Sequence, residues 1–205
     1  MDDCLTEVGL RRMLVLLFRI MEEGFCWLGT PCSSWVSLSR SWSQRTCLSP
    51  EGPRHASVKL SKYLKLNNAV AIISALIIRT CKVLHIRHMV EQPRSSLLYR
   101  FKPMRLALCD ADSCNLAMSS FGGTSPKPLK LMGDKRIGRT MRGVHLKLQK
   151  LISKPTGRLT KERHGTRYTG DKSALTESSA YTAKFGRCVA LAFLGDTPQK
   201  ILTMV

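Results

Sequence analysis

A cysteine and a glutamate lie in two short motifs of this sequence, and both residue types can take part in covalent chemistry. Cys32 ends the stretch GTPC, which directly follows an apolar run at 25–28, and Glu91 opens the stretch EQP. A thiolate is a nucleophile, and a carboxyl group can hold or deliver a proton. The alternative is an incidental cysteine near a turn and a strand-end carboxylate paired with an arginine such as Arg94.

The surrounding pattern predicts the elements that would position these two residues. Apolar periodicity indicates helices over 7–23 and 58–81, and short apolar runs indicate strands over 25–28 and 83–91. Residues 31–57 are rich in serine and proline and read as a loop, with tryptophans that could anchor it or stack on a base. Strands joined by a helical crossover form a parallel sheet, whose carboxyl ends share one crevice. We therefore expect Cys32 and Glu91 to meet there.

The second half of the chain has a weaker pattern and carries most of the charge. We expect a short helix at 95–101, strands at 116–121 and 129–132, and a terminal helix around 188–194. The net charge is +19, and residues 127–172 hold fourteen lysines and arginines against three acidic residues. Such a field attracts polyanions, so nucleic acid is the expected partner; a solvated basic face is the alternative. The residues expected to contact phosphates are Lys127, Lys130, Arg136, Arg139 and Arg142.

The cysteine usage and the amino-terminal residues bear on metals, membranes and location. Eight cysteines are scattered with no CxxC pair, so we expect reduced thiols, no metal site and an intracellular protein, nuclear or organellar locations included. Asp2 and Asp3 stand where a secretory signal has basic residues, so secretion is not expected. The apolar runs fall short of the roughly 20 residues that a membrane span needs, so no membrane partner is expected.

The motifs resemble those of the cytosine-5 DNA methyltransferases. The resemblance is carried by GTPCSS at 29–34, by the Glu-x-Pro at 91–93 after the next helix and strand, by TSPKPL at 124–129 and by SSAYTAKFGRCVA near the carboxyl end. The chain is also similar to uncharacterised proteins of marine algae that share the GTPCSSW, EQP and SPKP landmarks. The similarity spans roughly residues 6–195, but its chemistry is concentrated in the cysteine and glutamate motifs.

The resemblance implies an α/β fold with a partial Rossmann-like parallel sheet, flanking helices and a basic, less regular C-terminal part. The implied domains are residues 1–125, with the two motifs, and 126–205, the basic region with the terminal helix. In this reading Cys32 adds to carbon 6 of a cytosine flipped out of DNA, Glu91 holds the ring and supplies a proton, and S-adenosylmethionine supplies the methyl group. Arg139 and Arg142 would assist at the base.

The sequence also departs from the family pattern. No GxGxxG nucleotide loop occurs, no strand with a glycine-rich loop precedes the Pro-Cys segment, and Gln92 stands where the family has asparagine. These departures indicate a truncated or degenerate member. Two other functions stay open: a non-catalytic basic module that binds nucleic acid, and a non-functional remnant of a mobile element.

Overall fold

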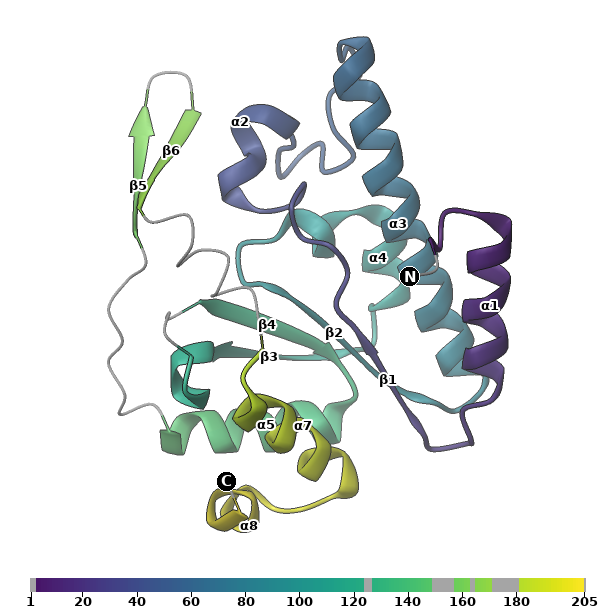
Figure 1. Cartoon of the computed structure of the whole chain (residues 1–205), viewed down its shortest axis with the longest axis vertical. Coiled ribbons are helices and arrows are strands. Elements are labelled where there is room, and N and C mark those ends of the chain that lie inside the picture. The colour runs from purple at the N-terminus through teal and green to yellow at the C-terminus, as the bar shows by residue number, and fades with distance from the viewer. Residues whose placement is uncertain (1–2, 124–126, 149–156, 163–164, 171–180, 205) are drawn as a thin grey trace. The chain divides into compact units, whose positions relative to one another are not determined.

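The computed structural model of the chain describes residues 3–123, 127–148, 157–162, 165–170 and 181–204. It divides into two compact units, residues 1–110 and 111–205, and each is described by itself. Figure 1 shows both units as mixed helix and strand.

Unit 1 contains the helix–strand–helix–strand order that the sequence predicts. Its elements are α1 (Glu7–Phe18), β1 (Phe25–Leu28), the 3-10 helix η1 (Ser37–Ser39), α2 (Arg40–Ser43), α3 (Val58–Val83), β2 (Arg87–Pro93), the 3-10 helix η2 (Leu97–Arg100) and α4 (Lys102–Ala107).

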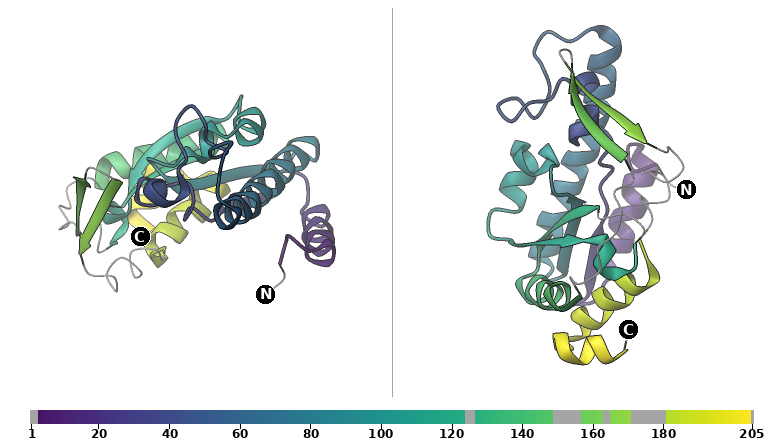
Figure 2. Two further views of the ribbon diagram at one scale, coloured as in Figure 1. Left: turned by 90° about the horizontal axis from the view of Figure 1, so that it is seen from above. Right: turned by 90° about the vertical axis from the view of Figure 1, so that its left-hand side faces the viewer.

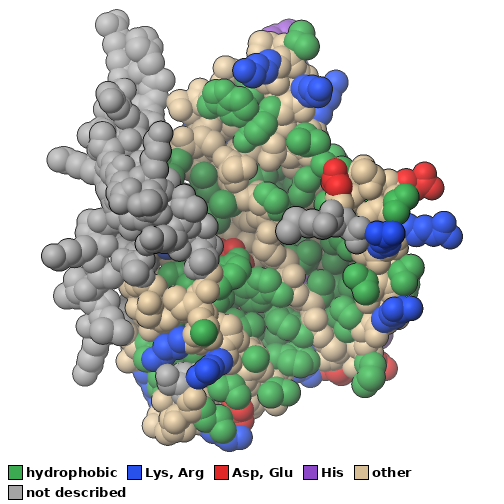
Figure 3. Space-filling view, viewed as in Figure 1, with side chains coloured by type: hydrophobic (Ala, Val, Ile, Leu, Met, Phe, Trp, Pro, Cys, Tyr) green, Lys and Arg blue, Asp and Glu red, His purple; other side chains and the backbone are tan. Residues whose placement is uncertain are grey.

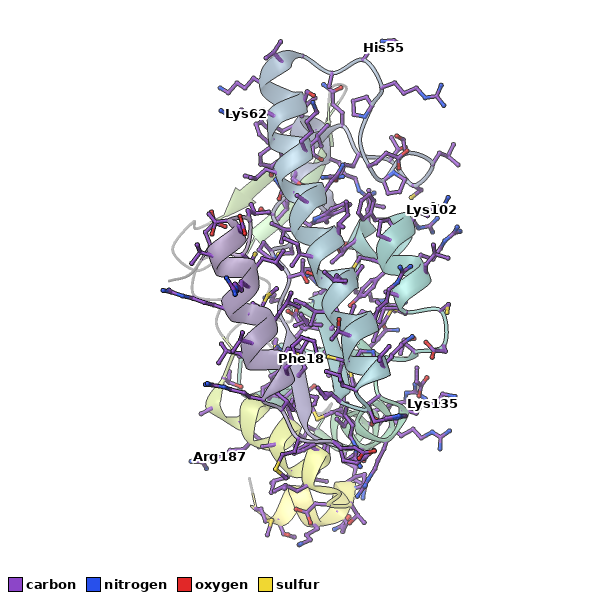
Figure 4. The ribbon with its side chains drawn as sticks, turned by 90° about the vertical axis from the view of Figure 1, so that its right-hand side faces the viewer. Phe18, His55, Lys62, Lys102, Lys135 and Arg187 are labelled. Carbon is purple, nitrogen blue, oxygen red and sulfur yellow. The ribbon has the colours of Figure 1, made fainter. Side chains whose placement is uncertain are left out.

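The strands β1 and β2 pair in parallel, in a register that runs from Phe25 opposite Arg87 to Leu28 opposite Val90. The helices α1, α3 and α4 form a layer that lies against this pair, and Figure 4 shows the three side by side with Phe18 at the end of α1. Leu17 and Cys81 are buried in the core of this layer, where the half-buried Leu28 packs against them. The expected crossover from strand through helix to parallel strand is therefore present.

Unit 2 follows a different pairing rule. Its elements are β3 (Asp112–Ala117), the 3-10 helix η3 (Met118–Phe121), β4 (Pro128–Gly133), α5 (Lys135–Leu148), β5 (Gly157–Glu162), β6 (Gly165–Gly170), α7 (Ala183–Leu194) and α8 (Pro198–Met204). The strands β3 and β4 pair antiparallel, with Cys114 opposite Leu131, and α5 packs on β3 and α7. The strands β5 and β6 form an antiparallel ribbon of their own (Figure 2).

The α/β class with flanking helices is thus confirmed, and the strand pairing is only partly parallel. A partial parallel sheet was expected because the two strands of residues 7–91 are joined by a helical crossover. The link between β3 and β4 is only ten residues long, with a 3-10 helix and a turn in its described part, and such a short connection suits antiparallel pairing.

Several element boundaries differ from those predicted. The helix α1 begins after its N-cap Thr6, whose hydroxyl accepts from the amide of Gly9, but it ends at Phe18 rather than at 23. The strand β2 begins at Arg87 rather than at 83, because α3 continues to Val83 and His85 adopts a positive φ of 53°. Because a histidine rarely marks a left-handed turn, the sequence does not indicate this turn.

Among the described helices, α3 is long and apolar enough to cross a membrane by length and composition alone. Its inward residues Ala71, Ile78 and Cys81 have no exposed surface at all. Other apolar residues of the same helix are exposed, among them Ile72 at 51% and Leu76 at 44%, and a third of its apolar window is buried.

Candidate functional site

Cys32 and Glu91 lie at the carboxyl ends of two adjacent parallel strands. The register pairs Leu28, the last residue of β1, with Val90, so Glu91 comes one step beyond the last paired position. Cys32 follows four residues after the end of β1. The structure therefore brings both motifs to the same end of one strand pair. Whether the two residues act in catalysis stays a prediction.

The segment that carries the thiol faces solvent, whereas the carboxylate lies inside. Gly29, Pro31 and Ser33 are exposed and Cys32 is half-buried. Glu91 is only 5% exposed. A half-buried thiol next to exposed backbone is accessible to a large substrate, and a buried carboxyl group can hold a defined orientation toward it.

Gln92 connects the two motif segments directly. Its Nε2 donates to the carbonyl oxygen of Thr30, and its Oε1 accepts from the hydroxyl of Ser96 at 2.9 Å. The Ser96 hydroxyl in turn accepts from the amide of Leu98 at 3.2 Å. Gln92 has no exposed surface, so both hydrogen bonds lie in a dry environment. The GTPC segment is thereby held against β2 and η2.

Thr30 is also fixed from the helical side. Its hydroxyl shares a 2.9 Å hydrogen bond with the hydroxyl of Ser74 on α3, and both residues are buried. A residue two positions before Cys32 is therefore bound by its backbone to β2 and by its side chain to α3.

The loop after Cys32 is closed around a tryptophan and an arginine. The amide of Trp35 donates to the carbonyl of Cys32 at 2.9 Å, and the Trp35 carbonyl accepts from the amide of Leu97 at 2.8 Å. The Arg45 guanidinium lies 3.6 Å above the Trp35 ring, and its Nε donates to the Ser34 hydroxyl at 2.9 Å. Trp35 and Arg45 are 1% and 2% exposed. Trp35 thus anchors the loop.

The residues expected to contact nucleic acid all lie in unit 2. Lys127 and Lys130 are half-buried on either side of the start of β4, and the Lys127 amine lies 5.9 Å from the Tyr181 ring. Arg136, Arg139 and Arg142 are exposed on α5.

Two of these arginines are engaged within unit 2. Arg142 donates to the carbonyl of Ser113 and lies 3.8 Å from Asp112. The Arg136 guanidinium lies against Gly195, which caps the carboxyl end of α7 with a positive φ of 94°. A cation at a helix carboxyl end is favourable, and it limits how freely Arg136 can reach another anion.

A cationic ridge remains on the outer side of α5. Lys135, Arg139 and Arg142 recur at spacings of three and four residues, so they lie on one face of the helix. The opposite face contributes Met141 and Val144 to the core. Lysine and arginine side chains also lie along α1 and over α7 and α8 (Figure 3).

The surroundings of four cysteines shift the pKa of their thiols. The thiols of Cys26 on β1 and Cys81 on α3 are hydrogen-bonded to each other; this bond lowers the pKa of Cys26 and raises that of Cys81. Burial raises the pKa of Cys114 to about 11 and also raises that of Cys188.

The described residues contain no group of three His, Cys, Asp or Glu side chains that could hold a metal ion. The described residues also do not form a glycine-rich loop of the kind that binds S-adenosylmethionine. The described part of unit 1 places only α1 before β1, and no two glycines of residues 3–110 lie closer than five positions apart. Local packing explains the glycines at positions 9 and 52. A Cβ at Gly9 would lie within 2.5 Å of Asp3, and a Cβ at Gly52 would lie within 2.5 Å of Leu64.

Sequence reasoning missed Arg45 and the Gln92 connection. An arginine in a serine-rich loop reads as solvent-exposed, and nothing in its neighbours signals that the chain folds over it. Gln92 was noted only as a departure from asparagine. Its spacing of four residues to Ser96 is the one signal that could have indicated a local hydrogen bond.

Comparison with known protein families, with curated proteins and with solved structures finds no match for this chain. The assignment of function therefore depends on the geometry described above and on the motif resemblance.

Proposed function

We propose that this chain is a cytosine-5 methyltransferase-like protein, degenerate in its cofactor-binding part, that engages a cytosine of DNA through Cys32 and Glu91. The observation that supports this proposal is the placement of both residues at the carboxyl ends of the adjacent parallel strands β1 and β2. The Gln92 to Thr30 hydrogen bond adds support, because it fixes the two motif segments to each other.

The chemistry of these two residues is an addition with proton transfer. The Cys32 sulfur attacks carbon 6 of cytosine, the C5–C6 double bond opens, and its electron pair moves through the ring toward N3. The Glu91 carboxyl group delivers a proton to N3 and accepts from the exocyclic amine. The half-buried thiol and buried carboxyl suit a base that has been flipped out of the duplex, since neither group reaches into a base stack.

S-adenosylmethionine is the methyl donor that the resemblance implies, but the described residues do not fit it. We derive no methyl-transfer step from this site. The proposal is limited to the addition of Cys32 to the base and the proton transfer by Glu91.

The test is covalent capture of DNA. Duplex DNA that contains 2-pyrimidinone, a cytosine without its amine, should form an adduct with the wild-type protein that mass spectrometry maps to Cys32. Cys32→Ser should form none, and Cys109→Ser, at an exposed cysteine, should behave as wild type. A second arm uses 5-fluorocytosine DNA with S-adenosylmethionine, in which an adduct would show that methyl transfer also survives. Absence of any Cys32 adduct in both arms would refute the proposal.

A non-catalytic module that binds nucleic acid is the second candidate, and the α5 ridge of Lys135, Arg139 and Arg142 favours it. DNA binding that weakens steeply with salt, without any adduct, would support this function in place of the first.

A further inference from the structure

Arg45 is an unusual residue of unit 1, because its charge is buried beside the loop of the proposed nucleophile. It is 2% exposed, and no carboxylate forms an ion pair with it within the part of the chain that the structure describes. Its Nη2 atom has no hydrogen-bond partner among those residues. Burial lowers the pKa of Arg45 to about 10, which measures how unfavourable this position is for a cation.

Glu51 and Tyr63 favour the charge of Arg45 electrostatically without forming an ion pair with it. A buried cation without an ion pair costs several kcal/mol unless the remaining contacts are favourable. The contacts present are all made to the loop that follows Cys32. Nε donates to Ser34, Nη1 donates to the carbonyl of Pro50, and the guanidinium plane covers the Trp35 ring. One planar group thus fixes three loop positions at once, which an ammonium group cannot do.

The local backbone brings Arg45 into this position. The helix α2 ends at Ser43, and its C-cap Gln44 adopts a left-handed conformation with a φ of 53° and donates its amide to the carbonyl of Arg40. This turn directs the chain inward at Arg45. The following turn, closed by the amide of Thr46 donating to Ser49 at 3.1 Å, presents the Pro50 carbonyl to the guanidinium.

The contacts of Arg45 lead directly to Cys32. Ser34 and Trp35 lie two and three residues after the cysteine, and the Trp35 amide donates to the Cys32 carbonyl. Trp35 also packs on Phe101, with ring centroids 5.2 Å apart, and accepts from Leu97. The turn from Cys32 to Trp35 is therefore held between Arg45 on one side and η2 on the other.

We infer that Arg45 is a positioning residue for Cys32: stacked on Trp35 and bonded to Ser34, it fixes the turn that sets the orientation and exposure of the thiol. The effect of Arg45 on the reaction with a base rests on the proposed function, whereas its effect on the accessibility of the Cys32 thiol does not. Losing Arg45 frees the turn, so Cys32 becomes more accessible to a small reagent and worse oriented for a bound base.

The first experiment measures the thiol alone. Iodoacetamide alkylation is followed peptide by peptide by mass spectrometry, with Cys109 as the internal reference because it is exposed and lies elsewhere in unit 1. In Arg45→Gln and Arg45→Lys the rate at Cys32 relative to Cys109 should rise about three- to tenfold, the factor that one net hydrogen bond represents. The matched control is Arg54→Gln, at an exposed arginine of the same segment, and it should leave the ratio unchanged.

A second variant keeps the test decisive if both Arg45 variants fail to fold. Ser34→Ala removes the acceptor of Nε and leaves the arginine in place, so it should shift the same ratio in the same direction by a smaller factor. An unchanged ratio in every folded variant would overturn the inference, because an arginine that only stabilises the unit would lower the melting temperature without changing Cys32.

The third measurement separates positioning from binding. If the proposed adduct forms, Arg45→Lys should slow adduct formation about tenfold or more while the dissociation constant for DNA stays the same. Equal losses in binding and adduct formation would contradict a positioning role. A wild-type protein that forms no adduct would refute the proposed function and leave the alkylation result to decide the role of Arg45.

Discussion

Replacing Gln92 by alanine should destabilise unit 1 strongly, because this side chain is the direct connection between the two motif segments. The change removes the hydrogen bond to the Thr30 carbonyl and the one from the Ser96 hydroxyl. Each contributes about 1 kcal/mol net, and a buried group left without its partner adds about 1–3 kcal/mol. Since Gln92 has no exposed surface, water cannot easily replace either contact. The sum is roughly 3–5 kcal/mol, a large share of the 5–15 kcal/mol typical of a domain.

Urea unfolding followed by circular dichroism measures this loss. The midpoint should fall for Gln92→Ala while the slope with urea stays the same, which separates lost stability from a changed unfolded state. Gln92→Asn, the residue found in the resembling family, is one methylene shorter and should lose one of the two contacts, or about 1–2 kcal/mol. Gln199→Ala, at an exposed glutamine of α8, is the matched control and should change stability by less than about 0.5 kcal/mol. An unchanged midpoint for Gln92→Ala would show that the Gln92 hydrogen bonds to Thr30 and Ser96 do not stabilise unit 1.

Three further outcomes follow from the structure. Gly52→Ala should lower the free energy of unfolding by about 1–3 kcal/mol in the same urea assay, since φ is +107° and the new Cβ would lie 2.5 Å from Leu64. The alkylation rate of Cys26 should level off at lower pH than that of Cys114, because the pKa of Cys26 is lowered and that of Cys114 is raised to about 11; identical pH profiles by mass spectrometry would contradict this. Arg139→Ala should weaken DNA binding a few-fold for any sequence and reduce the slope of log affinity against log salt by about one, and an unaltered slope would exclude a phosphate contact.

The sequence predicted α1, β1, α3 and β2 because their signals are local, whereas η1, α2 and α4 were not predicted. The strand at 25–28 is an apolar run between glycines, and the helix from 58 follows the capping serine Ser57. The meeting of Cys32 and Glu91 at one end of a strand pair followed from the general behaviour of helical crossovers. These inferences need only residue types and spacing.

The features that were missed depend on contacts distant in sequence or on backbone choices that many residues can make. Arg45 is buried because Pro50 and Trp35 surround it, and no pattern in a serine-rich loop indicates that. The antiparallel pairing of β3 with β4 depends on contacts between strands, which no residue of β3 signals, and the β5–β6 ribbon lies in the basic segment, where charge hides the alternation of a strand. The sequence therefore predicted the charge of unit 2, a strand at 129–132 and the terminal helix, but not the strand pairing.

The most direct test of the central claim is whether position 91 lies within reach of the Cys32 thiol. In Glu91→Cys, dibromobimane, a short reagent that joins two thiols, should give a linked peptide pair containing positions 32 and 91, because both positions follow the carboxyl ends of the adjacent strands β1 and β2 and the neighbouring Gln92 is hydrogen-bonded to Thr30. Alkylation of the exposed Cys109 shows in the same sample that the reagent is active. A folded variant in which Cys109 is alkylated, while positions 32 and 91 are each alkylated separately and never linked, would contradict the account.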